Sequence, residues 1–180
     1  MPSTGKVPNW YVVTGVPSSG ISTLVSALRP YVDKTFPEAA RMLIDRNLKR
    51  GIPVAVTRKD EGEFQKKVLR IKLLREARAR TDKLYVFERG IPDSIAYFEV
   101  AGLDSAPIKK HSNRYRKIFF LEPLKYEKDY ARTESEAVRD KLNNMLMASY
   151  TGLGYEVVFV PALPVEARVK LVLSHFDKDL

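Results

Sequence analysis

The sequence predicts a three-layer α/β fold in which one five-stranded parallel sheet carries helices on both faces. Three observations predict it. Short runs of β-branched and aromatic residues alternate with longer helical segments along the whole chain. A turn rich in glycine and serine, residues 15–22, directly follows the first of these runs. The 180 residues match the size of one domain and contain no repeat or low-complexity linker, so we expect a single domain over residues 1–180.

The first half of the chain is predicted to alternate strands and helices. Pro30 ends the first helix, and Gly51 closes the second, as glycine commonly does. Asp60 and Glu63 have the spacing of a capping box, which predicts the start of a long basic helix. The expected strands are residues 10–14, 53–57 and 84–87, and the expected helices are residues 20–29, 38–50 and 60–80.

The second half continues the same alternation. A helix is expected after Pro92, and another near Thr133, where Glu136 completes a second capping box. The remaining expected strands are residues 117–121 and 155–160, and the expected helices are residues 92–100, 133–151 and 164–176. In a parallel sheet of this kind, ligands bind at the carboxyl ends of the strands.

The composition excludes several classes of function. There are no cysteines, which rules out disulfides, thiolate metal sites and cysteine nucleophiles. No apolar run approaches the roughly 20 residues that cross a bilayer, and the N-terminus lacks a signal-peptide core, so we expect a cytoplasmic protein with no membrane partner. The 31 Lys and Arg residues against 22 Asp and Glu give a net charge of +9, which attracts nucleotides, phosphorylated metabolites or nucleic acid.

The turn after the first strand matches a phosphate-binding template at all but one position. Residues 15–22 read Gly-Val-Pro-Ser-Ser-Gly-Ile-Ser, against the pattern G-x-x-x-x-G-K-[ST] between a strand and a helix. The glycines let successive backbone N–H groups face one anion, and the following helix directs its positive end to the same place. The residues predicted to contact the nucleotide are Gly15, Ser18, Ser19, Gly20, Ser22 and Thr23, with the Ser22 hydroxyl as a Mg²⁺ ligand.

The mismatch is Ile21, which stands where the template has lysine. That lysine normally bridges the β- and γ-phosphates and stabilises charge that shifts during transfer. Losing such a contact costs roughly 2–4 kcal/mol of transition-state stabilisation unless another group replaces it. Either another cationic side chain replaces this lysine, or the protein has lost catalytic activity, and the sequence is compatible with both alternatives.

The third strand ends in a second group of charged residues. Glu88 at the strand tip is predicted to ligate Mg²⁺ or to accept a proton from a substrate hydroxyl. Arg89 is predicted to bind a phosphate or substrate anion, with Arg58 as a further substrate contact. Asp93 is a candidate catalytic residue, and its alternative role is a helix-terminal charge stabilised by the helix dipole.

A polar segment over about residues 122–139 is predicted to form a lid. Arg132 and Arg139 lie seven residues apart, about two helical turns, and so share one face. Arg132 is a candidate catalytic residue and both arginines are candidate nucleotide contacts, because arginines on a closing segment supply positive charge and exclude water. Lys125 and Lys128 are further candidates to replace the missing lysine.

These motifs resemble those of the small AAA-type P-loop ATPases and kinases related to ribosylnicotinamide kinase. The resemblance rests on segments that cover nearly the whole chain: 14–20, 88–98, 120–123, 129–135, 154–158 and 160–161. It implies a kinase-like P-loop fold and Mg²⁺-dependent phosphoryl transfer from ATP or GTP to a small acceptor. It also implies nucleotide or Mg²⁺ contacts at Gly15, Gly20 and Ser22, acidic site residues at Glu88 and Asp93, and the lid arginine at Arg132. The departures from the family pattern are Ile21 for lysine and Glu88 for aspartate.

Three functional hypotheses follow. In the first, the protein is a kinase acting on a nucleoside, a nucleotide or another hydroxylated small molecule. Its base is Glu88, since Glu-Arg followed by a small residue also resembles the motif of deoxynucleoside kinases, in which the acid takes the hydroxyl proton. In the second, it is a non-catalytic nucleotide sensor or scaffold with a degenerate loop. In the third, the acceptor is a polynucleotide end attracted by the net charge of +9.

Overall fold

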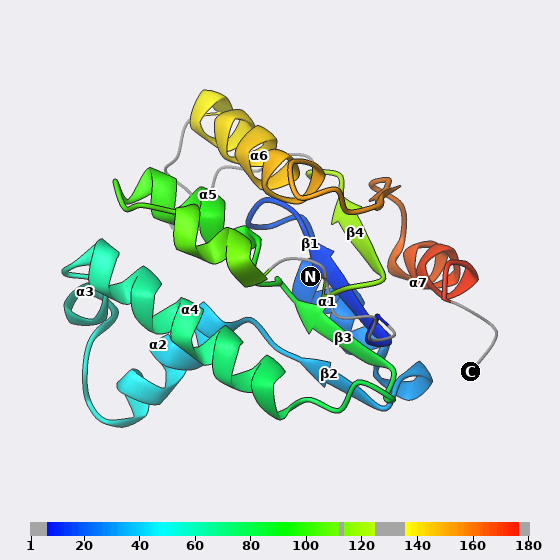
Figure 1. The fold of residues 1–180 in the computed structure, drawn as a ribbon, viewed down its shortest axis with the longest axis horizontal. Helices are drawn as coiled ribbons and strands as arrows, with labels where there is room; N and C mark the ends of the chain where they lie inside the picture. Colours follow the sequence, from blue (N-terminus) through cyan, green and yellow to red (C-terminus); the bar gives the residue numbers. More distant parts are fainter. Residues whose placement is uncertain (1–6, 112–113, 125–135, 177–180) are drawn as a thin grey trace.

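The computed structural model describes residues 7–111, 114–124 and 136–176. A five-stranded parallel sheet in the order β2-β3-β1-β4-β5 forms its centre (Figure 1). The strands are β1 (Trp10–Thr14), β2 (Lys34–Phe36), β3 (Tyr85–Glu88), β4 (Lys117–Leu121) and β5 (Val157–Val160). Because β1 is the central strand, the loop that follows it opens between β3 and β4. The predicted fold class is confirmed.

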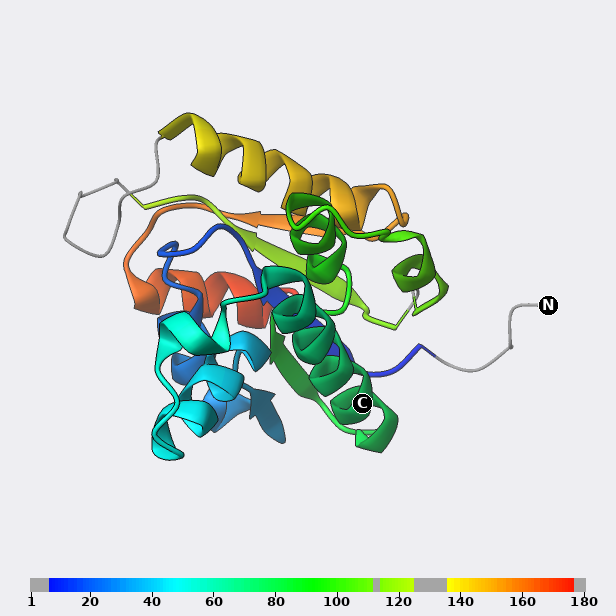
Figure 2. The same cartoon turned by 90° about the vertical axis from the view of Figure 1, so that its left-hand side faces the viewer.

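Helices cover both faces of the sheet (Figure 2). They are α1 (Ile21–Ala27), α2 (Ala39–Lys49), α3 (Val54–Thr57), α4 (Glu61–Arg78), α5 (Asp93–Val100), α6 (Glu136–Thr151) and α7 (Val165–Ser174), with short 3₁₀ turns at Arg29–Tyr31 and Ala106–His111. Helices α1 and α7 pack on each other and on one face. On the other face α5 contacts both α4 and α6, and α2 packs on α4.

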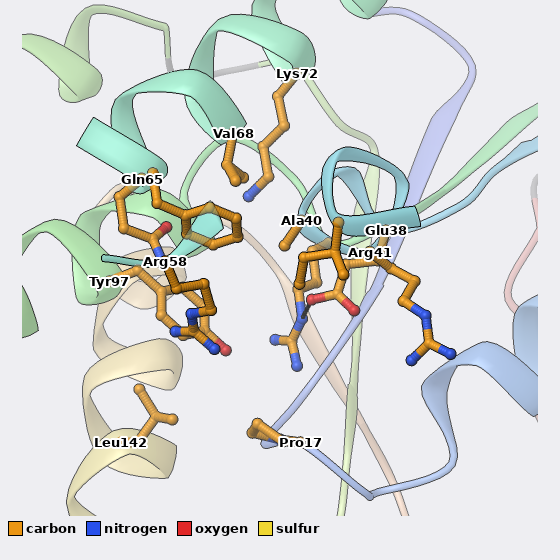
Figure 3. A pocket seen from close by; sticks show the side chains of 13 residues that line it. Pro17, Glu38, Ala40, Arg41, Arg58, Gln65, Val68, Lys72, Tyr97 and Leu142 are labelled. Atoms are coloured by element: carbon orange, nitrogen blue, oxygen red, sulfur yellow. Dashed lines mark hydrogen bonds and ion pairs between the residues drawn. The ribbon is translucent and has the colours of Figure 1, made fainter. Parts of the chain in front are cut away.

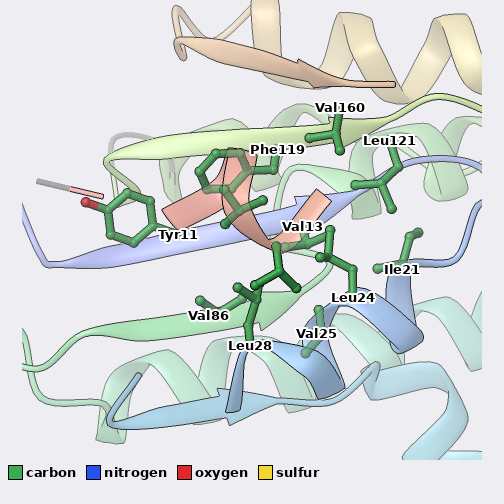
Figure 4. Packing of buried hydrophobic residues seen from close by; sticks show 12 residues of the cluster. Tyr11, Val13, Ile21, Leu24, Val25, Leu28, Val86, Phe119, Leu121 and Val160 are labelled. Atoms are coloured by element: carbon green, nitrogen blue, oxygen red, sulfur yellow. The ribbon is translucent and has the colours of Figure 1, made fainter. Parts of the chain in front are cut away.

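The central strand is buried from end to end, which explains its continuous apolar sequence. Tyr11 and Val13 face α1 and α7, where they join Phe119 and Leu121 of β4 in one cluster (Figure 4). The alternate residue Val12 faces the opposite layer, in a second cluster with Tyr150 of α6. The sheet therefore has two apolar faces, as its position between two helical layers requires.

One predicted strand is wrong. Residues 53–57 were expected to form the second strand from their β-branched residues, but Val54–Thr57 form the short helix α3. Thr57 is held in this turn by a hydrogen bond to its Oγ1 from the Asn47 side chain, at 3.2 Å. The actual second strand is Lys34–Phe36, which pairs with β3 and lies just before Pro37. Three residues are too short to give a recognisable alternating pattern.

The other predicted elements agree with the structure to within a few residues. The Asp60 side chain accepts a hydrogen bond from the Glu63 N–H at 2.9 Å, which confirms the capping box at the start of α4. The expected helix start at Thr133 lies outside the described residues, and α6 is described from Glu136. Within the described part of the chain, no helix combines the length and the apolar character needed to cross a membrane.

Candidate functional site

The loop between β1 and α1 adopts a conformation that needs both of its glycines. Gly15 has φ +148° and Gly20 has φ +84°, values that other residues rarely adopt. A Cβ on Gly15 would also lie 2.9 Å from the carbonyl oxygen of Leu121 and from Ser19 Oγ. Ser19 is buried, and its Oγ donates to the Val16 carbonyl at 2.8 Å, so this side chain holds the turn together. Ser18 is exposed at the loop tip and has φ 66°.

Ile21 does not point into this loop. Its side chain is 6% exposed and packs in the apolar cluster between α1, β4 and α7, which also contains Leu24, Leu121 and Val160 (Figure 4). The position that carries lysine in the template is therefore part of the core here. A replacement for the lysine charge has to come from another element.

Ser22 and Glu88 lie in direct contact. The Ser22 hydroxyl donates a hydrogen bond to Glu88 Oε1, and the backbone N–H of Glu38 donates to Glu88 Oε2 at 3.2 Å. An open hollow of about 630 Å³ runs past both side chains and is also lined by Thr35 and Arg41. The structure thus brings together the two residues that the sequence predicted as Mg²⁺ ligands.

A hydroxyl and a carboxylate are the hard oxygen donors that Mg²⁺ prefers. Within residues 7–111, 114–124 and 136–176 there is no group of three or more His, Asp or Glu side chains arranged to hold a metal ion. Ser22 Oγ and Glu88 Oε1 suit Mg²⁺ of the kind that nucleotide phosphates and water bind together with one or two protein oxygens.

Arg89 is held in a strained and buried position behind the loop. It has φ 62°, in the left-handed region, and is 6% exposed. Its Nη1 donates to the Gly15 carbonyl at 2.7 Å, and its Nε donates to Glu38 Oε1 at 3.1 Å. A non-glycine residue in this conformation is typical of functional sites, where the surroundings enforce the strain. Arg89 both fixes the phosphate loop and orients Glu38.

Asp93 is fully buried at the start of α5. Its carboxylate accepts hydrogen bonds from the Thr14 hydroxyl, from the Tyr150 hydroxyl and from the Gly90 N–H at 2.8 Å, and it lies 3.4 Å from Arg89 Nη1. All of these donors belong to the protein scaffold. This arrangement favours a positioning role for Asp93 over the catalytic contact predicted from the sequence.

A cavity of about 260 Å³ opens beside the phosphate loop, between α2, α4, α5 and α6 (Figure 3). Its wall mixes cationic, acidic, amide and aromatic side chains, which suits a polar organic molecule. The lining residues are Pro17, Glu38, Ala40, Arg41, Ile44, Arg58, Phe64, Gln65, Val68, Lys72, Arg89, Tyr97 and Leu142. Glu38 and Arg41 also line the open hollow at Ser22, so these two side chains stand where the two spaces meet.

Sequence reasoning missed Glu38, Gln65 and Lys72. Glu38 follows the unrecognised strand β2 by two residues, so recognition of that strand would have marked it as a strand-end carboxylate. Gln65 and Lys72 share one face of α4 with Val68, at helical spacing. Lys72 Nζ donates to the Gly90 carbonyl at 2.8 Å and to Ser94 Oγ at 3.1 Å, and burial lowers its pKa to about 8.

The remaining predicted residues are placed as follows. Arg58 lines the cavity, and its guanidinium donates to the Glu61 carboxylate at 2.8 and 3.0 Å. Thr23 is exposed in the first turn of α1. Arg139 lies on α6 and donates from Nη2 to the Leu124 carbonyl at 3.2 Å. The other lid candidates, Lys125, Lys128 and Arg132, lie outside the described residues.

Comparisons with known proteins agree on the fold. A family model described as an AAA domain matches residues 10–168. The deoxyadenosine kinase from M. mycoides, with the products dCMP and a flexible dCDP bound, has a TM-score of 0.60 at 13% sequence identity over 92% of this chain and 97% of that chain. Its structure with bound dATP gives a TM-score of 0.56 at 14% identity over the same shares.

The NadR protein in complex with NR has a TM-score of 0.63 at 17% identity over 93% of this chain. The match covers 51% of NadR, so this chain spans about half the length of that protein. No curated protein sequence matches the chain. At these identities the likeness shows the fold, which is the kinase-like P-loop fold that the sequence predicted.

Proposed function

Because the chain belongs to the AAA domain family and places a phosphate loop beside a cavity of mixed polar and apolar lining, we propose that it is a phosphotransferase. It moves a phosphoryl group from ATP or GTP to a hydroxyl of a nucleoside, a nucleotide or a similar small molecule. The observation that carries the proposal is the position of Glu38. Its carboxylate stands between the cavity and the hollow at Ser22, which is where an acceptor hydroxyl would meet a nucleotide phosphate.

In this proposal Glu38 is the general base. As the acceptor oxygen bonds to the γ-phosphorus, the bond from phosphorus to the bridging oxygen breaks, the nucleoside diphosphate leaves, and Glu38 takes the hydroxyl proton. Arg89 supports this role because its Nε holds Glu38 Oε1 at 3.1 Å and so fixes the direction of the carboxylate. Glu88, which the sequence predicted as the base, is bonded to Ser22 and is better placed beside Mg²⁺.

The other contacts divide between the two substrates. Backbone N–H groups of the loop, that of Gly20 among them, bind the nucleotide phosphates; Pro17 has no N–H, and the Ser19 N–H already donates to the Val16 carbonyl. Ser22 and Glu88 would hold Mg²⁺, which when bound neutralises phosphate charge. Arg132 remains a predicted contact of the transferred phosphate. On the acceptor side, Phe64 and Tyr97 line the cavity with aromatic rings, and Gln65, whose Nε2 donates to Glu61 at 2.8 Å, lines it with an amide. The bound nucleotides and NR in the structurally similar proteins support an acceptor of the nucleoside class.

The test is a screen for phosphate transfer from ATP and GTP to nucleosides and nucleoside monophosphates, followed by two variants. Glu38→Gln should lower kcat at least about 100-fold while the affinity for the phosphate donor stays within about threefold, since the lost base acts mainly in the transition state. Glu88→Gln should instead raise the Mg²⁺ concentration needed for half-maximal rate. Unchanged kcat in Glu38→Gln would remove Glu38 from the mechanism.

The burial of Ile21 favours a second candidate, a nucleotide sensor without transfer activity. A core isoleucine gives the loop no charge with which to stabilise the transition state. The two candidates differ in a simple measurement. A sensor binds ATP or GTP and shows no acceptor-dependent release of the diphosphate under any condition of the screen. The small volume of the cavity, about 260 Å³, favours a small acceptor over a polynucleotide end.

A further inference from the structure

An arginine from the last helix reaches the phosphate loop. Arg168 lies in the first turns of α7, and it is separated from the loop by almost the whole length of the chain. Its Nη1 donates a hydrogen bond to the carbonyl oxygen of Ser19 at 2.8 Å. The residue is 3% exposed, so a full positive charge lies buried directly against the loop whose own lysine is missing.

This guanidinium is poorly satisfied for a buried group. Among the described residues, Nε and Nη2 of Arg168 have no hydrogen-bond partner. Leaving a buried cation with unpaired N–H groups is destabilising, and apolar side chains of similar volume often replace such groups without loss of stability. A purely structural role at this position would therefore be served better by leucine or methionine. The presence of an arginine at position 168 is therefore better explained by a function at the phosphate loop than by fold stability.

The hydrogen bond from Arg168 affects the peptide group between Ser19 and Gly20. Ser19 and Gly20 are joined by a trans peptide, so the Gly20 N–H points away from the Ser19 carbonyl that Arg168 holds. A cation on the carbonyl also polarises the peptide and makes its N–H a stronger donor. Glycine suits this approach, because Gly20 has φ +84°, which other residues rarely adopt, and a Cβ there would lie 3.2 Å from Arg168 Nη1.

We infer that Arg168 is the positioning cation of the phosphate loop, which orients and polarises the Ser19–Gly20 peptide for binding nucleotide phosphates in place of the loop lysine. The inference rests on the proposed function in that it requires phosphate binding at this loop. It assigns a role to the last helix, which none of the sequence motifs marked. It also explains how a loop with isoleucine at position 21 can have a positive charge beside it, that of Arg168.

The experiment measures the binding of inorganic tripolyphosphate and of ATP by calorimetry, and the unfolding temperature without ligand. Arg168→Met should weaken both ligands roughly tenfold, because the loop loses a nearby positive charge and the polarisation of the Ser19–Gly20 peptide. Its ligand-free unfolding temperature should equal or exceed that of the wild type. Arg168→Lys keeps the charge and one donor, and it should bind within about threefold of the wild type. Lys170→Met, on the exposed face of the same helix, is the matched control and should bind normally.

The outcomes separate the inference from the function it builds on. Wild-type protein that binds neither tripolyphosphate nor ATP would overturn both. Wild-type binding that Arg168→Met retains would overturn the inference alone, as would a lower unfolding temperature with unchanged affinity, the signature of a structural residue. If the methionine variant does not fold, Arg168→Gln serves as the neutral variant. A folded Arg168→Lys protein that binds as weakly as the neutral variant would also overturn the inference, because charge would then be irrelevant.

Discussion

Tyr150, at the end of α6, donates a hydrogen bond to the carboxylate of Asp93, the first residue of α5. The same carboxylate accepts from Thr14 at the end of β1 and from the N–H of Gly90. Asp93 therefore connects the strand before the phosphate loop to α5 and α6, two of the four helices that border the cavity. The geometry of the site depends on this buried carboxylate, although no substrate touches it in the proposed mechanism.

The first prediction concerns the hydrogen bonds that the Asp93 carboxylate accepts. Asp93→Asn should lower the free energy of unfolding by about 2–4 kcal/mol, because an amide turns a donor toward groups that also donate and removes one of the two carboxylates that neutralise Arg89. Urea denaturation measures the change. Tyr150→Phe removes only one of the donors and should cost less than Asp93→Asn.

The control for this prediction is Asp45→Asn, which alters an exposed carboxylate paired with Arg41 at 3.3 Å. Its effect should stay within about 1 kcal/mol, since exposed ion pairs contribute little. An Asp93→Asn protein that is as stable as the wild type but inactive would mean that Asp93 acts on the substrate, as the sequence first suggested.

The sequence predicted those parts of the site that depend on local motifs. Gly15, Gly20 and Ser22 follow from the spacing of one loop, and Glu88 from its place at the tip of an apolar strand. Glu38 could not be found in the same way, because β2 has only three residues and lies between Pro30 and Pro37. The missed strand and the missed carboxylate have the same cause.

The sequence also could not predict which charged helix residues are buried. Lys72 and Arg168 lie on helices that also carry several exposed charged residues, and nothing in their spacing distinguishes them. Their burial arises from contacts with residues far away in the chain, at Gly90 and Ser19. The role of Asp93 likewise depends on Tyr150, 57 residues later, which periodicity cannot reveal.

The second prediction concerns Ile21. Ile21→Lys should lower the free energy of unfolding by roughly 2–3 kcal/mol and should not increase nucleotide hydrolysis, because the side chain at this position enters the core. Ile21→Met conserves volume and should cost less than about 1.5 kcal/mol. Denaturation curves and a phosphate-release assay test both variants. A stable lysine variant with faster hydrolysis would show that the side chain can turn into the loop, and it would support a degenerate sensor.

A buried carboxylate outside the site gives a third prediction. Glu76 on α4 is 3% exposed. It accepts a hydrogen bond from the Tyr115 hydroxyl, and its Oε2 lies 3.6 Å from Arg114 Nη1. Burial raises the pKa of Glu76 from 4.5 to about 7, against the smaller opposing effects of Tyr115 and Arg114. Between these two pH values the folded protein binds a proton that the unfolded chain releases.

The stability that this carboxyl group contributes is therefore fully present below about pH 4.5 and is lost as the pH rises through about 7. Glu76→Gln stays neutral, so its free energy of unfolding should fall less between pH 5 and 8, and at pH 8 it should exceed the wild type by about 1–3 kcal/mol. Urea denaturation at four pH values tests this. At the top of the range Lys72, with its pKa lowered to about 8, contributes with the opposite sign in the wild type and in Glu76→Gln alike. Glu156→Gln, on an exposed carboxylate, should leave the wild-type slope unchanged. Identical slopes for wild type and Glu76→Gln would show that Glu76 is ionised throughout this range and that Arg114 outweighs the burial.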